Sequence, residues 1–174
     1  MNIEEQKFLY NQWITSCKSF HDVDSWFKQG FKFSAEREEE CWREIRSGTL
    51  PPRVLKPYEV FSLKSGCCLD ITWFTGKSLS LINSSYNIKY NTIVTIRFKL
   101  IHTLVTFTYN SKLYTIDYSF PETIPAFKAM CGLWGPFDSL DSIVKDFYLK
   151  MNPKYKNVDY YHEGWPDLRD YVVS

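Results

Sequence analysis

The first fifty residues carry apolar side chains at helical spacing. A period close to 3.6 residues places one set of apolar side chains along a single face near the start of the chain: Ile3, Tyr10, Trp13, Ile14, Cys17 and Phe20. A second helix is predicted after Ser34, a typical N-cap, and before Gly48, a typical helix stop. Its apolar positions fit one side of a helix: Cys41, Trp42 and Ile45. The Pro51–Pro52 pair then prevents helical continuation.

Two further helices follow from the same spacing. The first begins at Cys68 and ends before the polar stretch 83–87, with one side formed by Cys68, Ile71, Thr72, Thr75, Leu79 and Ile82. The other covers Ser139–Met151, with a buried stripe formed by Leu140, Ile143, Val144, Phe147 and Met151.

From Ile88 onward the pattern changes to that of strands. Residues 91–100, 102–109 and 112–120 are rich in Val, Ile, Thr, Tyr and Phe. The last two segments alternate in polarity, and Asn110–Ser111 between them predicts a hairpin turn. The chain is expected to be irregular from Pro121 to Asp138, and the aromatic tail, residues 159–174, has no clear period.

The pattern therefore predicts an α+β fold, with N-terminal helices followed by a helix packed on an antiparallel sheet. There is no internal repeat and no linker composition, so residues 1–174 are expected to form a single domain. Its parts would be a helical segment at 1–50, a core at 51–120, and a C-terminal helix with the aromatic tail at 121–174.

Composition narrows the class of protein. Hydrophobic residues make up 44% of the chain and aromatic residues 18%, which is typical of a folded domain. The net charge of +1 argues against nucleic acid and against a membrane as the main partner, since both require a concentrated basic surface. The Asn-, Lys- and Tyr-rich style is typical of an AT-rich genome, such as that of a phage or a parasite.

The cysteines indicate a reducing compartment. Five cysteines cannot all pair, and the adjacent Cys67 and Cys68 are a poor basis for a disulfide framework. No apolar segment follows Met1, and no run is long enough to span a bilayer. We therefore expect free thiols and a cytoplasmic protein, in the host cytoplasm if its origin is viral.

Three segments carry candidate chemistry. Residues 64–70 (KSGCCLD) place Cys68 at a loop-to-helix junction, residues 102–107 (HTLVTF) begin a strand with His102, and residues 113–119 (LYTIDYS) place Asp117 on the next strand. A helix N-terminus favours a thiolate, and an imidazole can exchange a proton with the thiol and the leaving group. A carboxylate on the paired strand can orient the imidazole. The sequence therefore predicts a catalytic triad of Cys68, His102 and Asp117, with a lowered pKa for Cys68.

As a set, these segments resemble the transglutaminase-like superfamily. Its members carry a Gly-x-Cys-x-Asp element that opens a helix, a His that begins a strand, and an Asp late in the following strand. The first element is Gly66-Cys67-Cys68-Leu69-Asp70 here, and Asp117 is followed by Tyr-Ser, as in the family. The resemblance covers about residues 51–120 and implies a papain-like core.

The resemblance also implies a chemistry. Cys68 would attack an amide carbonyl and form a thioester, which water or an amine acceptor would resolve. The expected substrate is a protein or peptide amide, the enzyme being a peptidase, amidase, deamidase or transamidase, and no cofactor is expected. The alternative is an inactive transglutaminase-like fold that serves as a protein-interaction module, including a viral inhibitor directed at a host protein.

Other residues have a structural interpretation beside a functional one. Cys67 is interpreted as structural, with modulation of Cys68 by oxidation as the alternative. Asp70 is interpreted as architectural. Cys17, His21 and Cys41 do not have the spacing of a zinc site. His162 is an alternative base for Cys68. A last set of aromatic residues is expected to pack in the core or to line a substrate groove: Trp134, Tyr160, Tyr161 and Trp165.

Overall fold

The computed structural model describes residues 1–49, 52–95, 100–121, 128, 130–151 and 160–163. The helices are α1 (Ile3–Ser16), α2 (Phe20–Lys28), α3 (Ala35–Arg46), α4 (Pro57–Leu63), α5 (Cys68–Ile82), the 3-10 helix η1 (Ser84–Tyr86) and α7 (Leu140–Met151). The strands are β1 (Lys32–Phe33), β2 (Ser65–Gly66), β3 (Lys89–Thr95), β4 (Leu100–Tyr109), β5 (Lys112–Asp117), β6 (Gly132–Phe137) and β7 (Tyr160–Glu163). The fold is α+β, as the sequence predicted.

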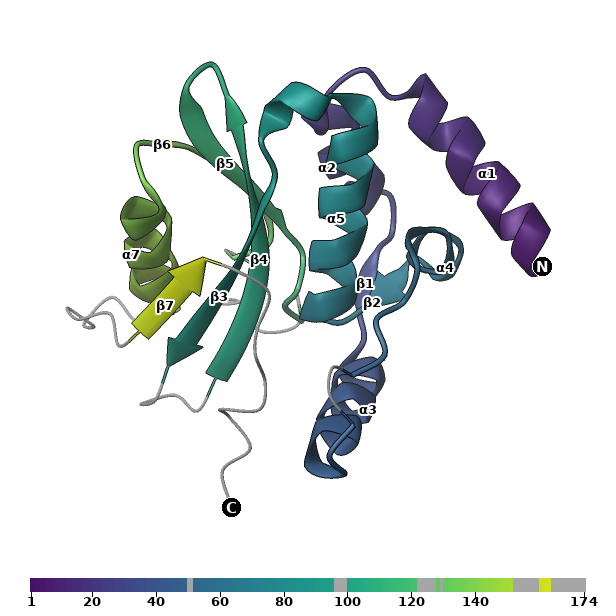
Figure 1. The fold of residues 1–174 in the computed structure, drawn as a ribbon, viewed down its shortest axis with the longest axis horizontal. Coiled ribbons are helices and arrows are strands. Elements are labelled where there is room, and N and C mark those ends of the chain that lie inside the picture. The colour runs from purple at the N-terminus through teal and green to yellow at the C-terminus, as the bar shows by residue number, and fades with distance from the viewer. Residues whose placement is uncertain (50–51, 96–99, 122–127, 129, 152–159, 164–174) are drawn as a thin grey trace.

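A five-stranded antiparallel sheet with the order β6-β5-β4-β3-β7 forms the centre of the fold. Helices α5 and α2 lie on one face of the sheet and α7 on the other (Figure 1). Because side chains alternate along a strand, each strand contributes to both layers. In β4, Phe107 packs in the α5 layer and Leu104 packs in the α7 layer. A short parallel pair, β1 with β2, lies apart from the main sheet.

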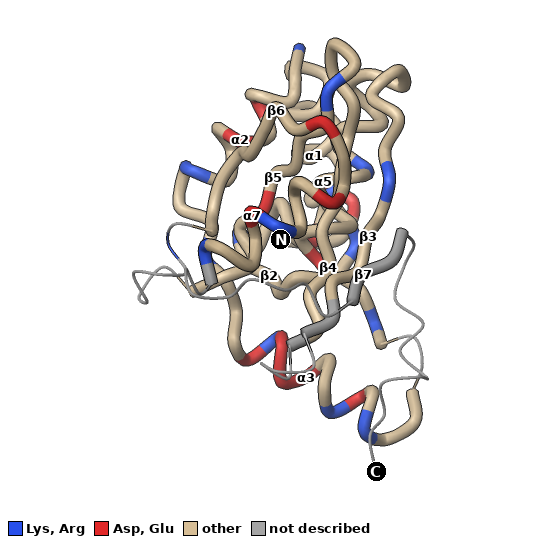
Figure 2. The backbone as a smooth tube through the Cα atoms, turned by 90° about the vertical axis from the view of Figure 1, so that its left-hand side faces the viewer, with Lys and Arg blue, Asp and Glu red and all other residues tan. Residues whose placement is uncertain are grey.

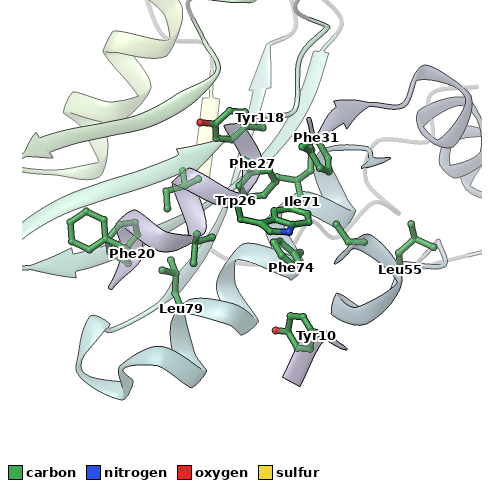
Figure 3. Close-up of a cluster of buried hydrophobic side chains, with 14 of the residues drawn as sticks. Tyr10, Phe20, Trp26, Phe27, Phe31, Leu55, Ile71, Phe74, Leu79 and Tyr118 are labelled. Atoms are coloured by element: carbon green, nitrogen blue, oxygen red, sulfur yellow. The ribbon is translucent and has the colours of Figure 1, made fainter. Parts of the chain in front are cut away.

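The core on the α5 face is mostly aromatic (Figure 3). Phe74 of α5 is fully buried, and its ring centroid lies 4.6 Å from that of Trp26 in α2 and 5.8 Å from that of Trp13 in α1. Phe27 meets the same ring edge-on at 5.6 Å. These ring contacts hold α1 and α2 against the helix that carries Cys68.

The predicted hairpin is confirmed. Strands β4 and β5 pair from Tyr109 and Lys112 outward, with only Asn110 and Ser111 between them. Both turn residues have positive φ, 49° and 60°, which is the backbone of a two-residue turn that matches the twist of the strands.

The structure differs from the predicted secondary structure in several places. The first apolar face is broken at residues 17–19, because the carboxylate of Asp22 accepts from the N–H groups of Lys18 and Ser19 and starts a new helix at Phe20. Helix α4 was missed, although Pro57 at its first turn favours a helix start.

In the C-terminal third, the segment expected to be irregular contains β6. Its glycines and proline hide the strand pattern, but it pairs along β5 from Asp117 to Leu113. The tail without a clear period contains β7, which pairs with β3. The rest of that tail, including Trp165, lies outside the described residues. Helix α7 begins within one residue of its predicted start.

Replacing Phe74 by Ala tests this packing. We expect a loss of about 3–5 kcal/mol in the free energy of unfolding, because the substitution removes a ring from the centre of the aromatic core. Urea denaturation followed by circular dichroism measures it. Phe8→Ala is the matched control, since Phe8 in α1 is 65% exposed and its removal should leave the midpoint nearly unchanged. Equal midpoints for both variants would contradict the packing of α5 described above.

Candidate functional site

Helix α5 begins at Cys68, as predicted. Cys67 is the N-cap residue, and its backbone N–H donates to Oδ2 of Asp70 at 3.1 Å, which closes a capping box around the first turn. Gly66 allows this closure, because a Cβ at that position would lie 3.0 Å from Cβ of Asp70. The Gly-x-Cys-x-Asp element is therefore a compact helix start that fixes the position of Cys68.

Asp70 joins three segments beneath that helix start. It is fully buried, and its carboxylate accepts from Nε of Arg37 at 3.2 Å, from the N–H of Leu55 at 2.8 Å and from the N–H of Cys67. Asp70 therefore connects α3, the loop before α4 and the cap of α5, which agrees with its architectural interpretation.

For both Asp70 and Arg37, burial and the opposite charge of the partner shift the pKa in opposite directions. Burial raises the pKa of Asp70 to about 7 and Cys67 adds to the increase, while the N–H of Leu55 and the guanidinium of Arg37 lower it. Burial would lower the pKa of Arg37, but the carboxylates of Asp70 and Glu40 raise it above its usual range. We assign the ionised pair, because the guanidinium and two backbone N–H groups all donate to the carboxylate.

His102 and Asp117 form a buried pair. Nε2 of His102 lies 2.6 Å from Oδ2 of Asp117, and the two side chains are 2% and 1% exposed. The other carboxylate oxygen accepts from the N–H of Ser119 at 2.9 Å. The imidazole stacks on Phe147 of α7, with centroids 5.3 Å apart, and lies 4.8 Å from Phe120. This arrangement fixes the ring, and Nδ1 is left without a hydrogen bond within the described part of the chain.

The first turn of α5 lies where β4 and β5 separate (Figure 1). The ladder between these strands extends only to Thr106 and Thr115. Beyond that pair, the carbonyl of Thr103 accepts from the hydroxyl of Thr72 in α5 at 2.9 Å. The hydroxyl and the backbone N–H of Thr103 act on the thiolate form of Cys68 as donors. Cys68 is thus held beside the residue that follows His102.

The structure brings His102 and Asp117 together, whereas Cys68 interacts with Thr103, the residue that follows His102 in β4. Because side chains alternate along β4, Thr103 points toward α5 and His102 toward α7. Among the described residues, no hydrogen bond joins Cys68 to His102. The pKa prediction for Cys68 was wrong for this arrangement. Its hydrogen bond with Cys67, together with burial, raises the pKa of the Cys68 thiol, and the donors from Thr103 only partly oppose this.

A pocket of about 380 Å³ opens beside Cys68. One wall is a single face of α3, formed by Glu38, Cys41, Trp42 and Ile45. The opposite wall comes from the start of α5 and from β4, with Cys67, Cys68, Leu69, Ile101 and Thr103. The candidate nucleophile therefore lies in the lining of this pocket.

Sequence reasoning found the apolar residues of this face but missed three polar contributors. Glu38 precedes Cys41 by three residues and Trp42 by four, a spacing that places it on the same face of α3. Arg37 and Thr103 carry no such signal, because their roles depend on contacts between segments far apart in the sequence.

The buried thiols of Cys41 and Cys67 lie 3.6 Å apart and are both free. Cys67 also donates to Asp70 at 3.3 Å. Cys41 thus belongs to this cluster. Among the described residues, no three His, Cys, Asp or Glu side chains are placed to hold a metal ion.

The remaining candidates lie elsewhere. Trp134 is buried in the core beneath α7, where Nζ of Lys150 lies 3.8 Å from its ring centroid. His162 lies in β7 opposite Thr92, with Tyr160 and Tyr161 in the same strand; the side chains of β7 lie outside the described part. Within that part, no helix is both long and apolar enough to cross a membrane.

One protein family matches most of the chain. The profile of a family described as a transglutaminase-like domain matches residues 7–126, a range that begins well before the 51–120 expected from the motifs. The N-terminal helices are therefore part of the matched region. No curated protein sequence matches the chain.

Solved structures of Legionella pneumophila LapG are similar to the chain. One has 16% sequence identity and a TM-score of 0.44, and covers 65% of this chain and 62% of LapG. An EGTA-treated form has 15% identity and a TM-score of 0.42, over 65% and 61% of the two chains. A calcium-bound form has 13% identity and a TM-score of 0.41, over 64% and 61%. The chain thus spans less than two thirds of the length of LapG.

Replacing Asp70 by Ala should lower the free energy of unfolding by about 3–5 kcal/mol, because Arg37 would keep its buried charge without a carboxylate. Thermal or urea unfolding at neutral pH measures the loss. Asp141→Ala, an exposed change of the same type in the first turn of α7, is the control and should shift the midpoint little. A tolerated Asp70→Ala would show that the site does not depend on this carboxylate.

Replacing Cys67 by Ala should shift the pH profile of Cys68 alkylation to lower pH. The hydrogen bond with Cys67 is the largest cause of the raised Cys68 pKa, so its removal should increase the thiolate fraction at neutral pH. Iodoacetamide labelling with peptide mapping gives the profile for each cysteine. Cys17→Ala, at the end of α1, should leave the profile unchanged, and an unshifted midpoint in Cys67→Ala would exclude Cys67 as the cause.

Proposed function

Because the chain belongs to the transglutaminase-like domain family, we propose that it is a cysteine-dependent acyl-transfer enzyme that acts on an amide bond through Cys68, His102 and Asp117. The observation that carries this proposal is the buried hydrogen bond of 2.6 Å between His102 and Asp117, in a strand that also contacts Cys68. A buried imidazole–carboxylate pair and a partly buried thiol at a helix start are the groups that such chemistry requires.

Each residue has a defined role in the proposed reaction. Asp117 accepts from Nε2–H of His102, which leaves Nδ1 as the ring nitrogen that exchanges a proton with Cys68. The thiolate attacks the amide carbonyl carbon, and the carbonyl oxygen becomes an oxyanion. The N–H of Cys68, at the first residue of α5, has no intrahelical acceptor and is one donor to that oxyanion.

The intermediate then collapses to a thioester. The carbon–nitrogen bond breaks, and the leaving ammonia or amine takes the proton from His102. Water gives hydrolysis or deamidation of the thioester, and an amine acceptor gives transfer. In both cases the new nucleophile loses its proton to His102, and the thiol of Cys68 is restored.

The reaction requires the thiol to leave Cys67 and Thr103 and to approach Nδ1 of His102. Thr103 directly follows His102 in β4, but the two side chains lie on opposite faces of the sheet, so the thiol or the ring must move for this approach. Pairing with the imidazolium would also offset the raised pKa of the free thiol. The resting arrangement is therefore a low-reactivity state, which the substrate would convert by displacing the thiol.

Acylation by an activated ester such as p-nitrophenyl acetate tests the proposal. The wild-type protein should release a burst of p-nitrophenol and gain the mass of one acetyl group on Cys68. Cys68→Ala should abolish both, while His102→Ala and Asp117→Asn should slow acylation, by about 100- to 10,000-fold for the loss of the base. Cys17→Ala, at the end of α1, is the control.

Release of ammonia from glutamine peptides, or incorporation of an amine, would then identify the acceptor. Equal acylation in wild type, His102→Ala and Asp117→Asn would overturn the triad. The interaction-module alternative would then account better for the fold.

A further inference from the structure

The pocket beside Cys68 contains a single charge. Apart from the thiols, Glu38 is the only ionisable side chain among the described residues that line the pocket. None of these residues is cationic. The rest of the surface near it is apolar, with Trp42 and Ile45 on α3 and Leu69 and Ile101 opposite. Such a lining is suited to an alkyl chain that ends in a positive charge.

Glu38 has no neutralising partner among the described residues. Its neighbours on α3 form ion pairs, Arg37 with Glu40 and Asp70 and Arg46 with Glu39, but the carboxylate of Glu38 has no hydrogen bond or ion pair within the described residues. Figure 2 shows the alternation of acidic and basic residues along α3. Within the described part of α3, Arg37 and Arg46 are therefore engaged by other carboxylates.

The position of Glu38 makes this charge costly. The residue is half-buried, and desolvation raises the pKa of its carboxyl group. Nearby Cys67 adds to the increase, and His102 opposes it. A partly desolvated carboxylate gains most from a cation that enters the same pocket. Trp42 adds an aromatic surface that attracts the same kind of group.

We propose that this pocket binds a cationic alkyl side chain of the substrate, such as that of a lysine or an arginine, and that Glu38 is its specificity-determining residue. The cation is recognised and does not react. This inference deepens the proposed function and rests on it, because the bound side chain would place a neighbouring amide within reach of Cys68.

Charge-matched thiol reagents test the pocket without a known substrate. The full-length protein is labelled at about pH 8, where an ordinary carboxyl group is ionised, with a neutral maleimide, one carrying a quaternary ammonium group and one carrying a sulfonate. Peptide mapping gives the rate at Cys68. The ratio of cationic to anionic rates reports the charge of the pocket, because the reactivity of the thiolate is common to both reagents.

Wild type should give a higher ratio at Cys68 than a free cysteine peptide does. In Glu38→Gln the ratio should fall by about fivefold, the upper end for an ion pair that is not fully buried. Glu39→Gln removes the same charge from the adjacent, 57% exposed position and should leave the ratio within the error of wild type. The neutral reagent reveals any change in the reactivity of Cys68 itself.

Protection provides a second measurement. n-Butylammonium should slow neutral labelling of Cys68 in wild type and in Glu39→Gln but not in Glu38→Gln, and n-butanol should protect none of them. An unchanged ratio and unchanged protection in Glu38→Gln would overturn the pocket assignment and leave the proposed function intact. Cation-selective labelling without any acylation by the activated ester would overturn the proposed function and leave the pocket. No labelling of Cys68 by any reagent would overturn both.

Discussion

The site depends on one buried carboxylate. Asp70 accepts hydrogen bonds from a guanidinium on α3, from the backbone of the loop before α4 and from the residue that caps α5. A buried carboxylate is stable only when its oxygens are occupied by donors, so these segments must meet at one point for the chain to fold. The same requirement places the start of α5, and therefore Cys68, against the wall formed by α3.

The position of α5 relative to the sheet explains the surroundings of the Cys68 thiol. The helix enters where β4 and β5 have ceased to pair, and Thr72 satisfies the carbonyl of Thr103 that a neighbouring strand would otherwise bind. The thiol is thereby held beside Thr103 of β4. The imidazole lies on the opposite face of the sheet, in contact with Phe120 and Phe147. The hydrogen bond with Cys67 and burial raise the pKa of the thiol at this position.

Much of this was readable in the sequence. The spacing after Cys68 predicted α5 to the residue, and the alternation around Asn110 predicted the hairpin that joins His102 and Asp117. Local patterns carry such information because each depends on side chains a few residues apart. Strand β6 was missed because its glycines and proline resemble a loop, and the raised pKa of Cys68 was missed because it depends on contacts with Cys67 and Thr103 in the folded chain.

The attachment of α3 has a thermodynamic consequence. This helix supplies one wall of the pocket, and it is joined to the start of α5 through Arg37 and the apolar contacts of Cys41. A ligand that needs both walls can bind only while α3 is docked, so its binding energy is added to the stability of that docking. Local opening of α3 and occupancy of the pocket are therefore linked equilibria, and the exchange rate of the α3 backbone amides is a measure of both.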